Sequence, residues 1–136
     1  MSLFRNLALL AGRFFIAAVF IYDATLIARF ATENRGYVES FGVPGFLLLP
    51  AGLFQFIGGL LIVIGLFTRL TAIAFAVFCL LTALIFHHNA ADVTEAIQFG
   101  KDLGLAAGFL FLAASGAGAW SLDARLGTDF WPFARA

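Results

Sequence analysis

Residues 46–88 have the sequence FLLLPAGLFQFIGGLLIVIGLFTRLTAIAFAVFCLLTALIFHH, in which two long apolar stretches flank the short polar segment Thr68-Arg69. Each stretch, about 46–67 and about 70–88, approaches the ~20 apolar residues that a helix requires to cross a bilayer. So short a connection predicts that the two helices are antiparallel neighbours. The segment therefore predicts a helical hairpin inside a membrane.

Two further apolar stretches flank the hairpin, at about 7–30 and about 101–119. In the whole chain 62% of residues are hydrophobic and 12% are charged, and the mean hydropathy is +1.01. Soluble domains contain about 45–50% apolar and about 25% charged residues. We therefore predict an all-α membrane protein, an antiparallel bundle of four transmembrane helices that forms one domain over residues 1–136.

Lysine and arginine predict the orientation, because they concentrate on the cytoplasmic side of a membrane. The end that holds both termini carries Arg5, Arg13, Arg69, Arg125 and Arg135, whereas the other end carries only Arg29, Arg35 and Lys101. We expect a multi-pass protein of a bacterial inner membrane with cytoplasmic termini. Arg13 and Arg69 would then extend to the cytoplasmic headgroups, with Arg69 also bonding the last carbonyls of the second span.

Aromatic residues predict where the chain meets the two membrane surfaces. Trp120 and Trp131 fit an aromatic belt at the cytoplasmic surface. Tyr37 and Phe41 would anchor an interfacial turn in the polar loop of residues 31–45, which faces outward together with the loop of residues 89–100.

The composition and the motifs exclude several classes of function. Eight Lys and Arg balance eight Asp and Glu, so we expect no nucleic-acid partner. Cys79 is the only cysteine, which excludes an intramolecular disulfide and a dithiol redox pair. Motifs for a serine nucleophile, a P-loop or a dinucleotide are absent. We expect no covalently bound cofactor, and we favour the interpretation that the chain has no enzymatic activity of its own.

Small residues predict the faces through which the helices pack in lipid. Ala72, Ala76, Cys79 and Ala83 share one face of the third span, and the next step of that face is His87. The corresponding small residues of the second and fourth spans are Gly52 and Gly59, which flank Gln55, and Gly104 and Gly108. In the first span the shared face consists of Arg13, Ala17, Ala24 and Ala28.

Ionisable and polar residues near the outward-facing end form a candidate polar pocket, consisting of Asp23, Gln55, His87, Lys101 and Asp102. A charge at the bilayer centre costs roughly 2.5–3.5 kcal/mol, so such residues serve a purpose. The first interpretation is a structural network in which Lys101 pairs with Asp23 or Asp102. We favour this interpretation because buried polar groups of bundles usually satisfy one another. The second is a pocket in which His87 exchanges protons with a quinol.

His87 and His88, with Asn89, Asp92 and Glu95 nearby, raise the question of a metal or haem site. Adjacent histidines on a helix point in different directions, and a catalytic zinc site requires three suitably spaced protein ligands. We therefore predict no metal site, with His87 and His88 as the candidates if one exists.

Several motifs resemble those of the DoxX family. They are the Gly12-Arg13 pair, Gly42-Val-Pro44, the segment GLFTRLTA at residues 65–72, Phe86-His87, Phe99-x-Lys101-x-Leu103, and GAGAWSLD at residues 116–123. The resemblance covers roughly residues 7–126 and implies a four-helix inner-membrane protein. Members of the family are linked to quinone-coupled thiosulfate oxidation and to oxidative-stress complexes, which implies a redox context here.

The chain departs from the DoxX pattern at three polar positions. Many relatives have a lysine where Ile27 stands and a glutamate where Gln55 stands, and they have asparagine where this chain has Asp102. The loss of a lysine and a glutamate together leaves neither charge unpaired, as expected if the two are partners. Asp23 and Asp102 are this chain's own acids.

The sequence and the resemblance together give three functional hypotheses. The first is an accessory or membrane-anchoring subunit of a redox-related complex, with the lipid bilayer and other membrane or redox proteins as partners. The second is a quinone-interacting oxidoreductase component that uses the outer polar pocket, with quinone as its ligand. The third is a small-solute transporter, which the lack of an internal repeat and of a broken helix disfavours.

Overall fold

The computed structural model describes residues 2–129, and the secondary structure in that range is entirely helical. Four helical segments are long and apolar enough to cross a membrane. They are α1 (Leu3–Arg29), α3 (Leu48–Ile64) with the preceding 3-10 turn η1 (Gly45–Leu47), α4 (Thr68–Phe86) and α5 (Val93–Ser115). Two shorter helices, α2 (Ala31–Ser40) and α6 (Leu122–Leu126), lie outside the spans. The prediction of an all-α membrane protein with four spans is confirmed.

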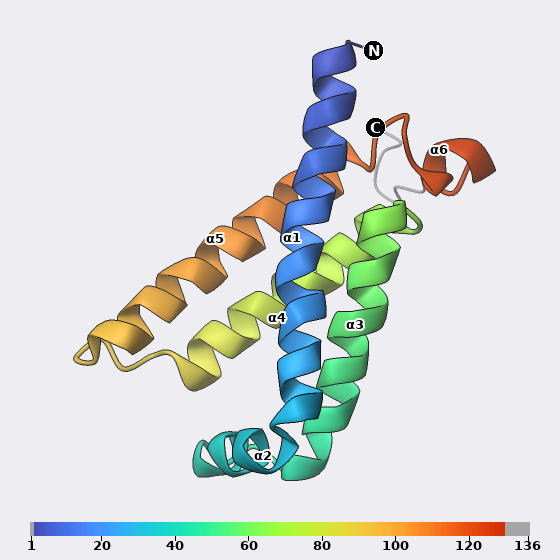
Figure 1. Cartoon of the computed structure of the whole chain (residues 1–136). Helices are drawn as coiled ribbons and strands as arrows, with labels where there is room; N and C mark the ends of the chain where they lie inside the picture. Colours follow the sequence, from blue (N-terminus) through green and yellow to red (C-terminus); the bar gives the residue numbers. More distant parts are fainter. Residues whose placement is uncertain (1, 130–136) are drawn as a thin grey trace.

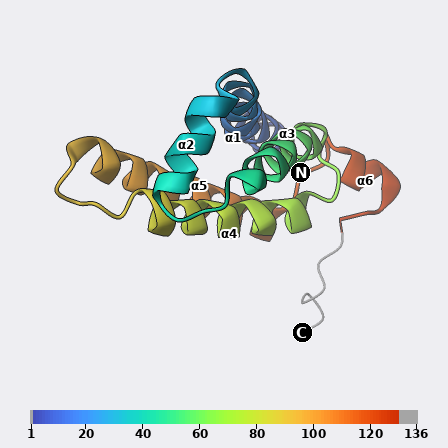
Figure 2. The ribbon, with the colours of Figure 1, turned by 90° about the horizontal axis from the view of Figure 1, so that it is seen from below.

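The four spans form two pairs that cross each other, α1 with α3 and α4 with α5 (Figures 1 and 2). One end of the molecule, called the loop end below, holds α2 and the α4–α5 connection at residues 87–92. The terminal end holds the start of α1, the α3–α4 turn and α6 (Figure 1). Helices α3 and α4 share the predicted tight turn but diverge from it. They are therefore not the paired antiparallel neighbours that the sequence predicts.

Glycines of α3 explain the pairing of α3 with α1. A Cβ on Gly59 would overlap the side chain of Ile21, and a Cβ on Gly52 would stand 3.2 Å from Ile27. The two backbones therefore approach closely through these positions, as small residues allow in lipid. On the adjacent face of α3, a Cβ on Gly58 would lie 2.8 Å from the ring of Phe75, so a large side chain separates α4 from α3 there.

The core lies where the two pairs cross, and each span contributes at least one phenylalanine to it. The ring of Phe75 lies 4.6 Å from that of Phe20, 4.8 Å from that of Phe54 and 4.8 Å from that of Phe109, measured between centroids. Offset or tilted aromatic pairs at such distances contribute about 0.5–1.5 kcal/mol each beyond burial. Small buried residues of α4, including Ala72, Ala76 and Cys79, complete the core.

Helix α5 begins earlier than the sequence analysis predicts, at Val93 instead of about residue 101. The side chain of Asp92 accepts hydrogen bonds from the backbone N–H groups of Thr94 and Glu95, at 2.8 Å and 3.2 Å. Asp92 is thus an N-cap, and Glu95 stands at the third helical position, as in a capping box. The helix ends at Ser115 because Gly116 adopts a φ of +74°, so the predicted end at about 119 is also corrected.

Helix α2 occupies most of the segment that we expect to be a polar loop. Tyr37 and Phe41 pack against Phe86 at the end of α4, with ring centroids 5.8 Å and 5.3 Å apart. The two residues predicted as interfacial anchors therefore also tie α2 to α4. Trp120 is exposed, as a belt residue would be, and Trp131 lies outside the described residues.

Candidate functional site

Polar side chains from all four spans form a cluster toward the loop end. Its members, called the loop-end cluster below, are Asp23 of α1, Gln55 of α3, Thr82 of α4, His87 at the end of α4, and Glu95 and Asp102 of α5. The structure thus brings together four of the five residues of the predicted polar pocket. Thr82 and Glu95 join them, whereas Lys101 does not.

His87 connects the first turn of α5 to the interior of the cluster. It caps the C-terminus of α4, and its Nδ1 lies 2.6 Å from Oε2 of Glu95. Its Nε2 lies 4.0 Å from Oδ2 of Asp102. Glu95 and Asp102 are seven residues apart on α5, so they share a helix face at a rise of about 10 Å. His87 therefore stands between an acid near the surface and an acid deeper in the span.

Asp102 contacts Thr82 across the α4–α5 interface. The Thr82 hydroxyl lies 3.0 Å from Oδ2 of Asp102 and 3.0 Å from the carbonyl oxygen of Cys79. The hydroxyl has one hydrogen to donate. Only one of the two contacts can therefore take its hydrogen from Thr82 at a time.

Gln55 and Asp23 lie together on the α1–α3 side of the cluster. The side-chain amide of Gln55 lies beside the Asp23 carboxylate, which also interacts electrostatically with Asp102. Gln55 is 3% exposed, and its Oε1 has no hydrogen-bond partner. Asp23 itself is exposed on the surface of the helix bundle.

Lys101 lies on the exposed face of α5, and it forms no ion pair within residues 2–129. The predicted structural network, in which Lys101 pairs with Asp23 or Asp102, is therefore wrong. The reason is helix geometry, since Asp102 precedes the buried Ala106 by one turn and so takes the inward face. Gly104 likewise faces open space, whereas Gly108 approaches Ile16 of α1.

The histidines form no metal site in the part of the chain that the structure describes. No group of three or more His, Cys, Asp or Glu residues there has a suitable arrangement for a metal ion. His87 faces the cluster, whereas His88 is exposed and its ring lies 6.5 Å from that of Phe41. The two side chains thus diverge, as expected for adjacent positions.

A pocket of about 520 Å³ opens beside the cluster at the loop end. Its lining consists of Phe41, Phe86, His88, Asn89, Asp92 and Glu95. Tyr37 stacks on Phe86, which is one of these lining residues. Burial, and then the nearby Glu95 carboxylate, raise the pKa of the Tyr37 hydroxyl. The pocket therefore combines aromatic walls with Glu95, which also contacts His87.

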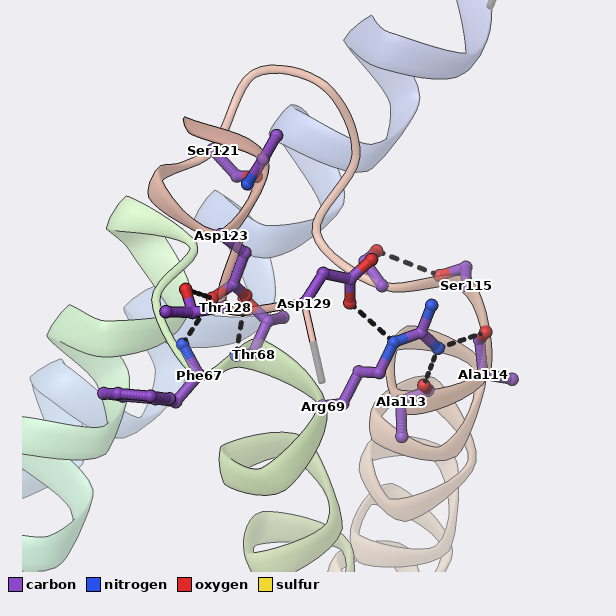
Figure 3. Close-up of polar contacts among 12 residues, drawn as sticks. Phe67, Thr68, Arg69, Ala113, Ala114, Ser115, Ser121, Asp123, Thr128 and Asp129 are labelled. Carbon is purple, nitrogen blue, oxygen red and sulfur yellow. Dashed lines mark hydrogen bonds and ion pairs between the residues drawn. The ribbon is translucent and has the colours of Figure 1, made fainter. Parts of the chain in front are cut away.

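A second polar cluster lies at the terminal end, where Asp123 joins α6 to the start of α4 (Figure 3). Its carboxylate accepts hydrogen bonds from the backbone N–H groups of Phe67 and Thr68, at 2.7 Å and 2.9 Å, and from the Thr128 hydroxyl at 2.7 Å. Asp123 is 1% exposed. Burial would raise its pKa, but these hydrogen bonds outweigh burial and hold the pKa of Asp123 below the ordinary value.

Arg13 is 1% exposed and lies inside the terminal end, so the expected extension to the headgroups is wrong. Its Nη2 donates to the carbonyl oxygen of Trp120 at 2.6 Å, and its charge interacts with that of Asp123. A Cβ on Gly65 would overlap Nη1 of Arg13. The segment that follows α5 folds over Arg13 and excludes it from solvent, which the sequence alone does not reveal.

Arg69 fastens the end of α5 to the start of α4. Its Nη1 donates to the carbonyl oxygens of Ala113 and Ala114, both at 2.6 Å, and its Nε pairs with Asp129 at 2.6 Å (Figure 3). Arg69 therefore binds the last carbonyls of the fourth span, where we expect those of the second. Arg13, Thr68, Arg69, Asp123, Thr128 and Asp129 are called the terminal-end cluster below.

Comparisons with known proteins agree with this architecture. A model of the DoxX family matches residues 8–88. The inner membrane protein YqjF of Escherichia coli K12 is 46% identical over 93 residues, which cover 68% of this chain and 72% of YqjF. The inner membrane protein YphA of the same organism is 34% identical over 128 residues, which cover 89% of this chain and 91% of YphA.

No solved structure matches the chain. The family model nevertheless spans more than half of it and includes α1, α3 and α4, and the relative YphA extends the similarity through most of the remainder. Together with the four membrane-spanning helices, these matches show that the chain is an integral inner-membrane protein that belongs to the DoxX family.

Proposed function

We propose that this protein is a quinone-interacting membrane component of a redox system, acting through the loop-end cluster. The observation that carries the proposal is the contact between His87 and Glu95, 2.6 Å long, at the edge of an aromatic-walled pocket. Reduction of a quinone by two electrons takes up two protons, and histidine exchanges protons near neutral pH. The absence of Lys101 from the cluster supports the proposal, because no lysine or arginine of residues 2–129 neutralises its acids.

The pocket suits the ring of a quinone in shape and in chemistry. Phe41 and Phe86 stand edge to face, with an interplanar angle of 82°, and offer apolar surfaces to a flat ring. The quinone oxygens would lie toward His88 and Glu95, the polar groups of the lining. Electrons would come from a partner protein, because a single cysteine provides no dithiol pair.

The experiment measures binding of a short-chain ubiquinone analogue to the purified full chain in lipid nanodiscs. We expect His87→Ala and Asp23→Asn each to raise the Kd by about tenfold, which corresponds to about 1.4 kcal/mol. Glu33→Gln is the matched control, because Glu33 is an exposed acid of α2 outside the cluster, and its Kd should stay within about twofold of the wild type. Unchanged binding in both cluster variants would contradict the proposal.

A second candidate is an accessory or membrane-anchoring subunit of a redox-related complex. It is favoured by an apolar pocket of about 470 Å³ along α1 and α3, whose lining includes Ala24, Ala28 and Gly52. Small residues of this kind accept a partner's transmembrane helix. After purification from native membranes in mild detergent, we expect a stable complex that Ala28→Leu disrupts and that Ala18→Leu, at another exposed position of α1, preserves. A monodisperse monomer without a companion would contradict this candidate.

We also propose that the termini are cytoplasmic and that the loop end faces outward, which the distribution of Lys and Arg supports. In a Cys79→Ala background, a membrane-impermeant maleimide should label Asn89→Cys in spheroplasts, because Asn89 is exposed at the loop end. It should label Ala124→Cys, exposed in α6, only after lysis. The reverse pattern would invert the orientation.

A further inference from the structure

We propose that Asp23 and Asp102 form one proton-binding site at the loop end of the bundle, with Gln55 beside Asp23 and with His87 and Glu95 as the route for protons to solution. The inference deepens the proposed function, since such a site would supply or accept the protons of a quinone. It does not require that a quinone binds, because the site is built from the chain's own residues. The ligand of this site is a proton.

The unpartnered amide oxygen of Gln55 indicates that a hydrogen-bond donor is missing. Gln55 is 97% buried, its Oε1 is without a hydrogen-bond partner, and its side chain lies beside the Asp23 carboxyl group. A buried acceptor without a donor is unfavourable. A protonated Asp23 would donate its hydrogen to Oε1 while it still accepts from the amide nitrogen. An acid and an amide then form two hydrogen bonds, and the missing donor is supplied by the proton.

The Thr82 hydroxyl has too few hydrogens for its two contacts. Its hydroxyl lies 3.0 Å from both the Cys79 carbonyl oxygen and Oδ2 of Asp102, and it can give its single hydrogen to only one of them. An ionised Asp102 has no hydrogen to contribute, so one of the two contacts lacks one. A neutral Asp102 donates to Thr82, and the Thr82 hydroxyl then donates to Cys79.

The charges around Asp23 and Asp102 also favour a bound proton. The Asp102 carboxylate acts on Asp23 as a like charge, and Asp23 lies on the bundle surface about 9 Å from the end of α1. The titratable side chains that face them are Cys79 and His87 from α4 and Glu95 from α5, whereas α3 contributes only the neutral Gln55. His87 is the single group of this set able to become a cation. Two carboxylates in such surroundings favour sharing one proton.

The route to solution follows the contacts of His87. Asp102 gives its proton to Nε2 of His87, and Nδ1 of His87 releases its own proton to Oε2 of Glu95, which lies 2.6 Å away. Glu95 lines the open pocket and passes that proton to water. The 4.0 Å separation between His87 and Asp102 is long for a direct transfer, so a bridging water or a small rotation of the ring completes this step.

The experiment is infrared spectroscopy of the full chain in nanodiscs without quinone, in water and in deuterium oxide, from about pH 5 to about pH 9. We expect, at neutral pH, one carboxylic-acid band that shifts in deuterium oxide. Asp23→Asn and Asp102→Asn should each remove or move it, and the exposed control Glu33→Gln should leave it in place. A spectrum without the band, or a band that both cluster variants leave unchanged, would overturn the proposal.

A further variant tests the route separately from the site. His87→Ala should keep the band but slow its exchange with deuterium oxide by about tenfold or more, and each variant is compared at equal helix content and monodispersity. Exchange as fast as in the wild type would overturn the route through His87. Because the measurement contains no quinone, failure of quinone binding and failure of the proton site are separate results.

Discussion

The two ends of the bundle both contain carboxylates away from water, but the groups that surround these carboxylates differ. At the terminal end, Asp123 accepts three hydrogen bonds and lies near the buried charge of Arg13. At the loop end, Asp23 and Asp102 lie near each other, without a lysine or arginine partner among residues 2–129. A carboxylate with three donors is stabilised as an anion, whereas paired acids in lipid favour uptake of a proton. The first arrangement holds the scaffold together, and the second is suited to chemistry.

The terminal end brings together three of the motifs that resemble those of the DoxX family. The Gly12-Arg13 pair, the segment at residues 65–72 and the segment at residues 116–123 are far apart in sequence, but they meet at the terminal end. Asp123 bonds Phe67 and Thr68 through its side chain and Gly65 through its backbone N–H, at 2.8 Å for the last. These three motifs of the DoxX resemblance therefore maintain the architecture of the terminal end.

The largest effect is expected when the terminal-end cluster loses its anion. Asp123→Ala removes the cap of α4 and leaves Arg13 as a buried charge with no counterion, which typically costs about 3–5 kcal/mol. The free energy of unfolding, measured by titration of a mild detergent with dodecyl sulfate, should fall by that amount. The control is Asp129→Ala, which breaks the more exposed ion pair with Arg69 and should cost about 1 kcal/mol or less. Equal losses in both variants would remove the distinction between the two acids.

A pair of glycines sharpens the comparison further. Gly65 and Gly127 have nearly the same φ, +70° and +69°, but a Cβ would overlap Arg13 only at Gly65. Gly127→Ala should therefore cost only the backbone strain, about 1–2 kcal/mol. Gly65→Ala adds displacement of a buried guanidinium, for a total of about 2–4 kcal/mol by the same titration. Similar losses would show that Arg13 is free to move.

The sequence was sufficient for the number and approximate position of the spans, because hydropathy alone determines which segments enter lipid. It was insufficient for the pairing of helices, which depends on the approach of Gly52 and Gly59 to α1. The early start of α5 did have a signal, since Asp92 and Glu95 occupy the N-cap and third helical positions of a capping box. The inward face of Asp102 also follows from its spacing to the apolar Ala106 and Phe109, whereas the glycine pair Gly104 and Gly108 does not indicate it.

The packing face predicted for the first span directs Arg13 toward the bundle, but the contacts of Arg13 with Trp120 and Asp123 had no comparable signal in the sequence. Contact between Arg13, Trp120 and Asp123 requires the segment after α5 to fold back over the bundle. Nothing in the local pattern of a single chain indicates such a distant contact. Arginine near a span end is usually drawn to the headgroups, so the general rule gave the wrong result here.

The loss of stability at acid pH should come from the terminal end. The folded-state pKa of Asp123 lies below its unfolded value of about 3.9. Its hydrogen bonds therefore stabilise the folded protein above that pH, and the stabilisation is lost as the pH falls through the folded-state pKa. We expect the thermal midpoint to drop below about pH 4 in the wild type and to drop less in Asp123→Asn. Identical acid profiles would assign the acid sensitivity to other groups.

The smallest effect separates the two interpretations of the loop end. If Lys101 neutralised Asp23 or Asp102 in the folded protein, Lys101→Ala would leave an acid unpaired within the membrane and would cost several kcal/mol. The structure instead places Lys101 on the exposed face of α5, so the free energy of unfolding should change by no more than about 0.5 kcal/mol. Arg29→Ala, which removes an exposed cation from the same end of the bundle, provides the matched baseline. A large loss for Lys101→Ala alone would restore the structural network, and it would leave the loop-end acids without a reason to share a proton.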